Sequence, residues 1–200
     1  MVAAPKPKRR QSKLLPVYPS LSDVHRILTA CPNERDAWLV KLLWFTGGRV
    51  SEVIAARVGD ITRSGLKLPN LKQHQSAEKH VFLPPGFLAE LRAYCAGRAP
   101  QDPIITHLAD GKPIGRKMAW IIVTRAGSRA GVLVKRYRED GLRPPWCHSF
   151  RHGNAIHLLE SGVPLNAVAG QLGHASLQST AVYLKLADPD RERLVSSVTF

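Results

Sequence analysis

Residues 148–162 read HSFRHGNAIHLLESG, and this stretch decides the fold of the C-terminal third of the chain. Gly162 is a typical residue to end a helix, and Pro164 is typical of the start of the next one, LNAVAGQLG at 165–173. The segments LQSTAVYLKL (177–186) and DPDRERLVSS (188–197) follow. We therefore predict that the C-terminal third is entirely helical.

Helix signals recur through the N-terminal two thirds. Ser20 and Asp23 have the spacing of a capping box, and Asn33 can cap the helix that follows. That second helix, ERDAWLVKLLWF, is apolar enough to be central, and a glycine pair ends it. The helices predicted in this part of the chain span residues 20–30, 34–45, 50–57, 86–97 and 116–131.

Two short segments have strand character instead. They are GLKLPNL (65–71) and KHVFLP (79–84), and the polar run KQHQSAE separates them. This pattern indicates a β-hairpin with a loose connection. The segment PIIT (103–106) is a candidate for a short extended piece. The predicted fold class is mainly α with a small antiparallel β-sheet (α+β).

Length and composition exclude several classes of protein. The 200 residues suffice for one domain with a core, and 44% of them are hydrophobic. There is no apolar run of about 18 residues, which a membrane span requires, and the N-terminus lacks the apolar core of a signal peptide. Cys31, Cys95 and Cys147 are few, odd in number and far apart, which argues against a disulfide framework and fits a reducing cytoplasm.

The charge points to a polyanionic partner. Lysines and arginines outnumber carboxylates by 29 to 15, the net charge is +14 and the isoelectric point is near 10.3. Nucleic acid is the leading candidate, and an anionic membrane surface is a weaker one. Residues 1–19 read as a flexible basic tail or linker, which either contacts DNA phosphates or is merely solvated. Its basic residues are Lys6, Lys8, Arg9, Arg10 and Lys13.

Four separated fragments each place polar or cationic residues in an apolar setting. Each is a weak signal alone, since an arginine after a glycine turn is commonly a surface residue and a tyrosine in an apolar helix is commonly a packed aromatic. The fragments are TGGRVSE with Arg49 and Glu52, LKQHQ with Lys72, HSFRHG with His148 and Arg151, and LGHASLQSTAVY with His174 and Tyr183.

The order and spacing of the four fragments resemble the tyrosine recombinase (phage integrase) family. The third fragment is close to the family pattern HxLRHxxATHLLExG, and the nine-residue step from His174 to Tyr183 is also the family's. The departures are Phe150, Gly153 and a gap between Lys72 and VFLP that is about two residues longer than the family pattern. The resemblance implies a tyrosine recombinase catalytic-domain fold over residues 20–200, ending in a C-terminal tail helix, without the family's usual N-terminal core-binding domain.

The resemblance also implies the chemistry. Tyr183 would be the nucleophile that forms a covalent 3′-phosphotyrosine. The other catalytic residues implied are Arg49, Lys72, His148, Arg151 and His174, with Glu52 supporting Arg49 and with neither a cofactor nor a metal. Arginines suit the task because a guanidinium stays charged and holds two phosphate oxygens at once. His148 would accept the phenol proton and Lys72 would protonate the leaving 5′ oxygen, with Lys67 and Lys79 as alternatives for the hairpin lysine.

Partners and rival interpretations follow from the same resemblance. It implies double-stranded DNA as substrate, a homo-tetramer assembled on DNA through the C-terminal tail, and a location in the prokaryotic cytoplasm or nucleoid, with no membrane partner. One rival is a DNA-binding domain of this fold that is inactive or needs a missing N-terminal domain. Another is a zinc hydrolase, because His148 and His152 lie four residues apart; no Glu of a metalloprotease helix stands between them.

Overall fold

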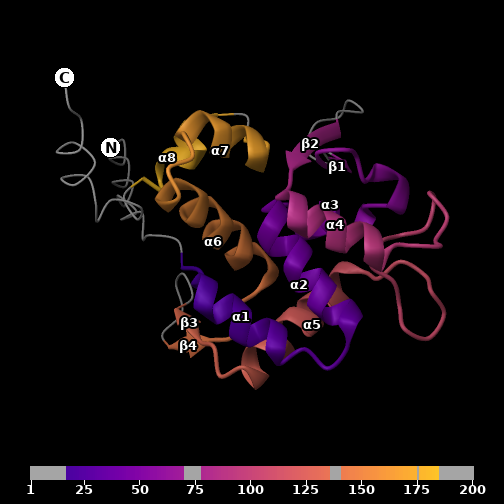
Figure 1. Cartoon of the computed structure of the whole chain (residues 1–200). Helices are drawn as coiled ribbons and strands as arrows, with labels where there is room; N and C mark the ends of the chain where they lie inside the picture. Colours follow the sequence, from indigo (N-terminus) through magenta and orange to yellow (C-terminus); the bar gives the residue numbers. More distant parts are fainter. Residues whose placement is uncertain (1–16, 70–77, 136–140, 175, 185–200) are drawn as a thin grey trace, which may run out of the picture.

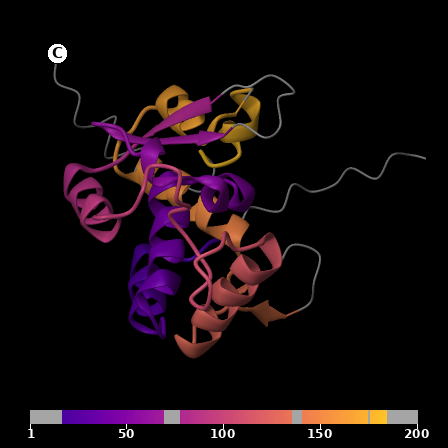
Figure 2. The same ribbon diagram turned by 90° about the vertical axis from the view of Figure 1, so that its right-hand side faces the viewer.

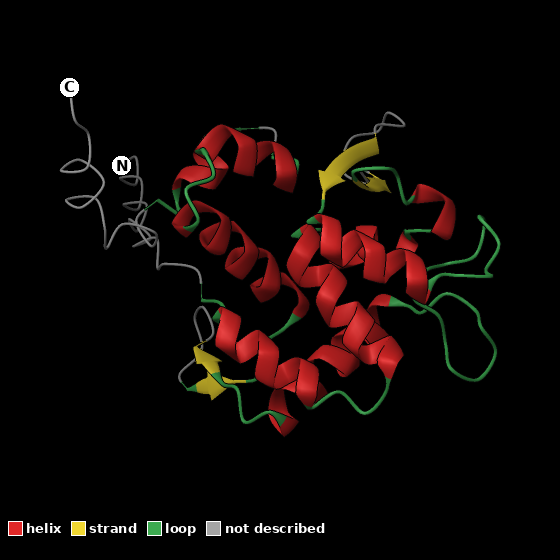
Figure 3. Ribbon diagram, in the orientation of Figure 1, coloured by secondary structure: helices red, strands yellow, loops and turns green. Residues whose placement is uncertain are grey.

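The computed structural model describes residues 17–69, 78–135, 141–174 and 176–184. The fold is mainly α with a small antiparallel sheet, as predicted, and it has a second small hairpin as well (Figures 1 and 3). The helices are α1 (Leu21–Thr29), α2 (Glu34–Thr46), α3 (Val50–Ala55), α4 (Pro85–Tyr94), α5 (Arg116–Arg129), α6 (Cys147–Glu160), α7 (Leu165–Leu172) and α8 (Gln178–Ala181), with a 3-10 turn at Val58–Asp60. The strands are β1 (Gly65–Pro69), β2 (Glu78–Phe82), β3 (Val134–Lys135) and β4 (Leu142–Arg143).

Three of the predicted helix boundaries are confirmed by their caps. The Ser20 hydroxyl accepts a hydrogen bond from the Asp23 backbone N–H, while the Asp23 carboxylate accepts from the Ser20 N–H, so the capping box is complete. The Asn33 side chain accepts from the first turn of α2. Gly47 ends α2 in the left-handed conformation with φ of 56°, which a residue with a side chain rarely adopts.

Helix α2 is the centre of the molecule. It packs against α1, α3, α5 and α6, and the two views in Figures 1 and 2 show these helices around it. Leu39, Val40, Leu42 and Leu43 are fully buried there, so α2 is apolar on nearly all sides, as its sequence indicated. No helix in the described part of the chain combines the length and apolar character needed to cross a bilayer.

The predicted hairpin is confirmed as β1 and β2, which pair antiparallel with Leu68 opposite Lys79. Gly65 begins β1 with its backbone against β2, and a β-carbon there would lie 1.9 Å from the Val81 carbonyl oxygen. Strand β2 packs against α7, which also contacts α6 and α8 (Figure 1). The hairpin therefore meets the segment that carries His174.

The structure differs from the sequence predictions in a second hairpin and in the length of several helices: α3 ends at Ala55 and not at residue 57, and α4 ends at Tyr94 and not at residue 97. The β3–β4 hairpin was not predicted, because two-residue strands leave no alternating pattern. The helix predicted over 177–186 is shorter, since α8 ends at Ala181 and a turn covers 182–184. The basic residues of the predicted N-terminal tail, the predicted helix at 188–197 and Lys72 lie outside the described residues.

Candidate active site

Arg49 sits at the start of α3, directly after the turn made by Gly47 and Gly48. Its guanidinium Nη1 donates to Glu52 Oε1 at 2.6 Å, and its backbone N–H donates to Glu52 Oε2 at 3.0 Å. Burial would raise the pKa of the Glu52 carboxyl, but hydrogen bonds from Lys79 and Arg49 outweigh this effect and hold the pKa below its ordinary 4.5. A carboxylate therefore fixes the Arg49 guanidinium at the helix start.

Arg151 comes from α6, whose first turn is held by Ser149 bonding the backbone of Trp146. Its side chain is only 2% exposed, and Nη1 donates to the Gly47 carbonyl oxygen at 2.8 Å. Nη2 is buried without a hydrogen-bond partner. A buried guanidinium nitrogen with no acceptor is costly, and such a group in a native protein calls for an explanation. An anionic ligand would provide the missing acceptor.

Burial, together with the positive charge of Arg49, lowers the pKa of Arg151 to about 10. At neutral pH this guanidinium is still protonated. Because Arg151 donates to the carbonyl of Gly47, two residues before Arg49, the two arginines lie in the same region although they are far apart in sequence. Gly47 makes this approach possible, since a β-carbon there would lie 2.5 Å from the side-chain oxygen of Asn154.

The hairpin contributes Lys79 to this region. Its side chain is 8% exposed, and Nζ lies 2.8 Å from Glu52 Oε2 and donates to the Leu172 carbonyl oxygen at 3.2 Å. Lys67 is on the opposite face of β1, 51% exposed, and pairs with Glu78 at 3.4 Å. Of the two alternatives to Lys72 for the hairpin lysine, only Lys79 lies at the site, where it shares the Glu52 carboxylate with Arg49.

His174 follows the end of α7, where Gly173 takes a left-handed φ of 67°. Its Nδ1 lies 2.7 Å from the hydroxyl of the buried Thr180. Burial, followed by the charges of Arg151, Arg49 and Lys79, lowers the pKa of His174 to about 4. The imidazole is therefore neutral at physiological pH, and if Nδ1 accepts from Thr180, Nε2 carries the proton and is able to donate.

Tyr183 is 3% exposed and packs with apolar residues of α6 and α7. Its hydroxyl lies 2.8 Å from Nδ1 of His152. Burial raises the pKa of the Tyr183 phenol, and Arg151 acts in the opposite direction, so the phenol lies within electrostatic range of that arginine. His148 lies one turn before His152 on α6, and the two rings meet edge to face with centroids 4.6 Å apart.

The contact between His152 and Tyr183 was missed by the sequence analysis, which named His152 only as a possible zinc ligand beside His148. Burial first, then His148 and Arg151, lower the pKa of His152 to about 3, so it meets the phenol as a neutral imidazole. Its place one helical turn after His148 was the only available signal. Among the described residues, no group of three or more His, Cys, Asp or Glu is arranged to hold a metal ion.

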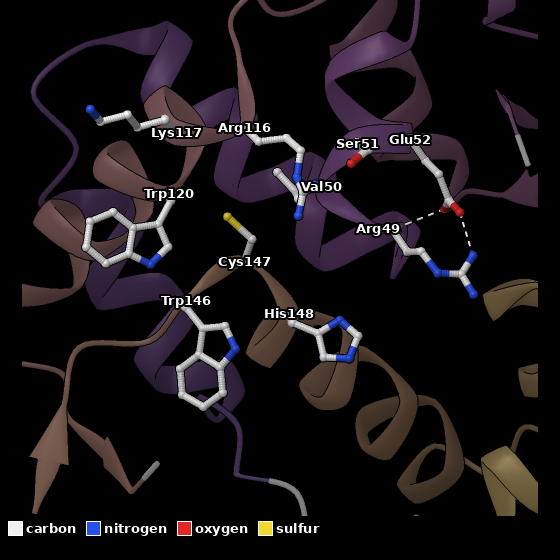
Figure 4. Close-up of a pocket in the computed structure, with 10 residues that line it drawn as sticks. All are labelled: Arg49, Val50, Ser51, Glu52, Arg116, Lys117, Trp120, Trp146, Cys147 and His148. Carbon is white, nitrogen blue, oxygen red and sulfur yellow. Dashed lines mark hydrogen bonds and ion pairs between the residues drawn. The ribbon is translucent and has the colours of Figure 1, made fainter. Parts of the chain in front are cut away.

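A pocket of about 770 Å³ opens beside Arg49 and His148 (Figure 4). Figure 4 shows two tryptophans, Trp120 from α5 and Trp146 before α6, on one side of it, with the basic start of α5 above. Aromatic rings and cations, including Arg49, thus form much of the wall of the pocket. Its lining residues are Arg49, Val50, Ser51, Glu52, Arg116, Lys117, Trp120, Trp146, Cys147 and His148.

Comparison with known proteins identifies the family to which this chain belongs. The sequence pattern of the phage integrase family matches residues 20–189. The chain belongs to this family. Among phage integrase family relatives, it is 27% identical over 179 residues to tyrosine recombinase XerA of Pyrococcus furiosus, covering 87% of this chain and 59% of that protein. It is 30% identical over 195 residues to tyrosine recombinase XerD of Corynebacterium glutamicum, covering 89% and 60%. The chain thus spans about three fifths of the length of these curated relatives.

Solved structures of the family share the fold. A crystal structure of XerA recombinase matches with a TM-score of 0.71 at 20% identity, over 98% of this chain and 68% of that one. XerH recombinase in a post-cleavage complex with a palindromic difH substrate matches with a TM-score of 0.68 at 20% identity, over 95% and 55%. A lambda integrase tetramer bound to a Holliday junction matches with a TM-score of 0.66 at 16% identity, over 88% and 50%. The predicted catalytic-domain fold is therefore confirmed.

Proposed function

We propose that this chain is the catalytic domain of a site-specific DNA recombinase that cuts and rejoins DNA through a 3′-phosphotyrosine on Tyr183. The convergence of Arg49, Arg151, His174 and Tyr183, from four separate segments, carries the proposal. The buried, unpaired Nη2 of Arg151 beside this cluster suits an anionic ligand. The relatives named tyrosine recombinases and the XerH complex with its substrate support a DNA phosphate as that ligand.

The two arginines and His174 bind the scissile phosphate in this proposal. Attack on a phosphodiester adds negative charge to its non-bridging oxygens, and fixed donors that meet this charge lower the barrier. Arg49 is held in place by Glu52, and Arg151 by the Gly47 carbonyl, so little reorganisation is needed. His174 adds a neutral donor, held by its contact with Thr180.

Tyr183 supplies the nucleophile. A phenol with an ordinary pKa of 10.0 needs a base, and burial makes the need greater because it raises the pKa further. His148 takes the phenol proton in this proposal. The hydroxyl now contacts His152, one helical turn beyond His148, so a shift of about 5 Å along α6 transfers it to His148.

The leaving group needs a proton as well. The phenolate oxygen forms a bond to phosphorus while the bond to the 5′ oxygen breaks, and Lys72 protonates that oxygen. The products are a 3′-phosphotyrosyl link and a free 5′ hydroxyl. Rejoining reverses these steps with the proton returning to Lys72, so the bond energy is conserved and no nucleotide triphosphate is consumed.

Assembly on DNA completes the proposal. The chain acts on double-stranded DNA as a homo-tetramer in which C-terminal tails link neighbouring subunits; the lambda integrase tetramer on a Holliday junction supports the tetrameric state. The basic residues of the N-terminal tail, Lys6, Lys8, Arg9, Arg10 and Lys13, add phosphate contacts. The net charge of +14 is in keeping with such a partner.

Covalent trapping tests the proposal. The substrate is a duplex of a recombination site, nicked just downstream of the scissile phosphate so that the freed fragment diffuses away and the adduct persists. The purified chain should form a protease-sensitive protein–DNA adduct, and Tyr183→Phe should form none while binding the duplex equally well. Tyr94→Phe, on α4, is the matched control and should react normally. Binding without any adduct would favour the inactive DNA-binding domain instead.

A further inference from the structure

Lys79 is an unusual residue for its place in the structure. Lysine is rarely buried, yet the side chain of Lys79 is 8% exposed inside the contact between β2, α3 and the end of α7. Burial lowers its pKa, while the hydrogen bond and charge of Glu52 act in the opposite direction. A buried ammonium is tolerated only where nearby acceptors compensate for lost hydration.

Two acceptors from different segments provide that compensation. One is Glu52 Oε2 on α3, at 2.8 Å. The other is the Leu172 carbonyl oxygen at 3.2 Å, one of the last carbonyls of α7, which have no partner within the helix and lie at its negative end. Lys79 therefore ties the hairpin to two further elements, α3 and α7.

Both elements carry a residue of the proposed site. Glu52 shares its carboxylate between Arg49 and Lys79, so the position of the lysine sets the position of the arginine. At the other end, Gly173 precedes His174, and a β-carbon at Gly173 would lie 2.9 Å from Cδ of Lys79. The lysine stem thus fills the space that the glycine leaves.

We infer that Lys79 is a positioning residue, which aligns Arg49 through Glu52 and aligns His174 through the end of α7. This inference rests on the proposed function. The Nζ atom of Lys79 is engaged by two acceptors within the protein, which leaves Lys72 as the donor to the leaving oxygen. The hairpin then carries two lysines with separate tasks, one that orders the phosphate site and one that transfers a proton.

The test compares Lys79→Met with Lys72→Met in single-turnover cleavage of two nicked duplexes. One has the natural 5′ oxygen at the scissile bond, and the other has sulfur there, which departs as a thiolate and needs no proton. Lys79→Met should slow adduct formation about 10- to 100-fold on both duplexes, because misplaced groups lose rate whatever the leaving group. Lys72→Met should form the adduct slowly on the oxygen duplex and at the normal rate on the sulfur duplex. Lys67→Met, on the exposed face of the same hairpin, is the control and should be normal.

The rate constant and the amplitude of adduct formation distinguish a positioning defect from a folding defect. A positioning defect lowers the rate constant while all molecules still react, whereas a folding defect lowers only the reacting fraction. Lys79→Gln, which keeps a hydrogen-bond donor, provides a second variant should the methionine variant not fold. Restoration of Lys79→Met by sulfur, a normal rate constant, or a loss of amplitude alone would each overturn the inference. Absence of any adduct from the unmodified chain would instead refute the proposed recombinase function.

Discussion

Replacing Arg151 by lysine asks whether a forked guanidinium is needed or only a positive charge. In the structure Nη1 is committed to the Gly47 carbonyl at 2.8 Å, and the buried Nη2 is left for a ligand. An ammonium is a single point of charge and cannot fill both places. Loss of one preorganised donor to a developing oxyanion costs about 3–4 kcal/mol, or about 10² to 10³ in rate. We expect Arg151→Lys to form the Tyr183 adduct more slowly by that factor.

The assay is single-turnover trapping on the nicked duplex, with DNA affinity and thermal unfolding measured for the same protein. Affinity for DNA should change little, because many phosphates contribute to binding. The unfolding free energy should fall by about 1–3 kcal/mol if the Gly47 carbonyl loses its partner. Arg26→Lys is the matched control, since Arg26 is 58% exposed and pairs with Asp23 on α1. Adduct formation within threefold of the unmodified rate would refute the forked-clamp argument.

Two further predictions concern charge. The affinity of Tyr183→Phe for duplex DNA should fall by about 10³ between about 50 and 200 mM salt, as for roughly six neutralised phosphates, and a flat response in a filter-binding titration would contradict the electrostatic argument. The denaturant midpoint of unfolding should fall from pH 7 to pH 5: the pKa values of His152 and His174 are about 3 and about 4 when folded against 6.5 ordinarily, so the unfolded chain binds protons that the folded one does not. The contribution of these two histidines to the free energy of unfolding is full above pH 6.5 and declines below it. His152→Asn should make this decline smaller. A denaturant midpoint that does not change between pH 7 and pH 5 would exclude neutral buried imidazoles.

The helices could be predicted because their signals are local. Ser20 and Asn33 cap from within one turn, and Gly47 ends α2 by its own backbone freedom. The β3–β4 hairpin escaped prediction because strands of two residues have too few positions to show alternation. The pairing of β3 with β4 depends on where the end of α5 and the start of α6 place the chain, and no local sequence pattern encodes this.

The residues of the site also fall into two groups, those that the sequence predicts and those that it does not. The motif residues could be found because the order and spacing of four fragments are a property of the sequence itself. The partners of those residues are a property of packing. Nothing near Lys79 in sequence indicates Glu52 or the end of α7, and the pairing of His152 with Tyr183 spans 31 residues and arises only when the turn after α8 packs on α6. Sequence reasoning therefore identified reacting groups better than the groups that hold them.

The charges of the described site suit a transition state better than a ground state. Arg49, Lys79 and Arg151 are cations at neutral pH, and Glu52 is the carboxylate they surround, so the cluster retains two positive charges. The two histidines with depressed pKa add none. A phosphodiester brings one negative charge, and attack by the phenolate of Tyr183 brings a second. In the proposed reaction the phenol proton passes to His148, outside this cluster, so the two positive charges around the phosphate are balanced only as the tyrosine joins it, which is the condition for stabilising the transition state more than bound DNA.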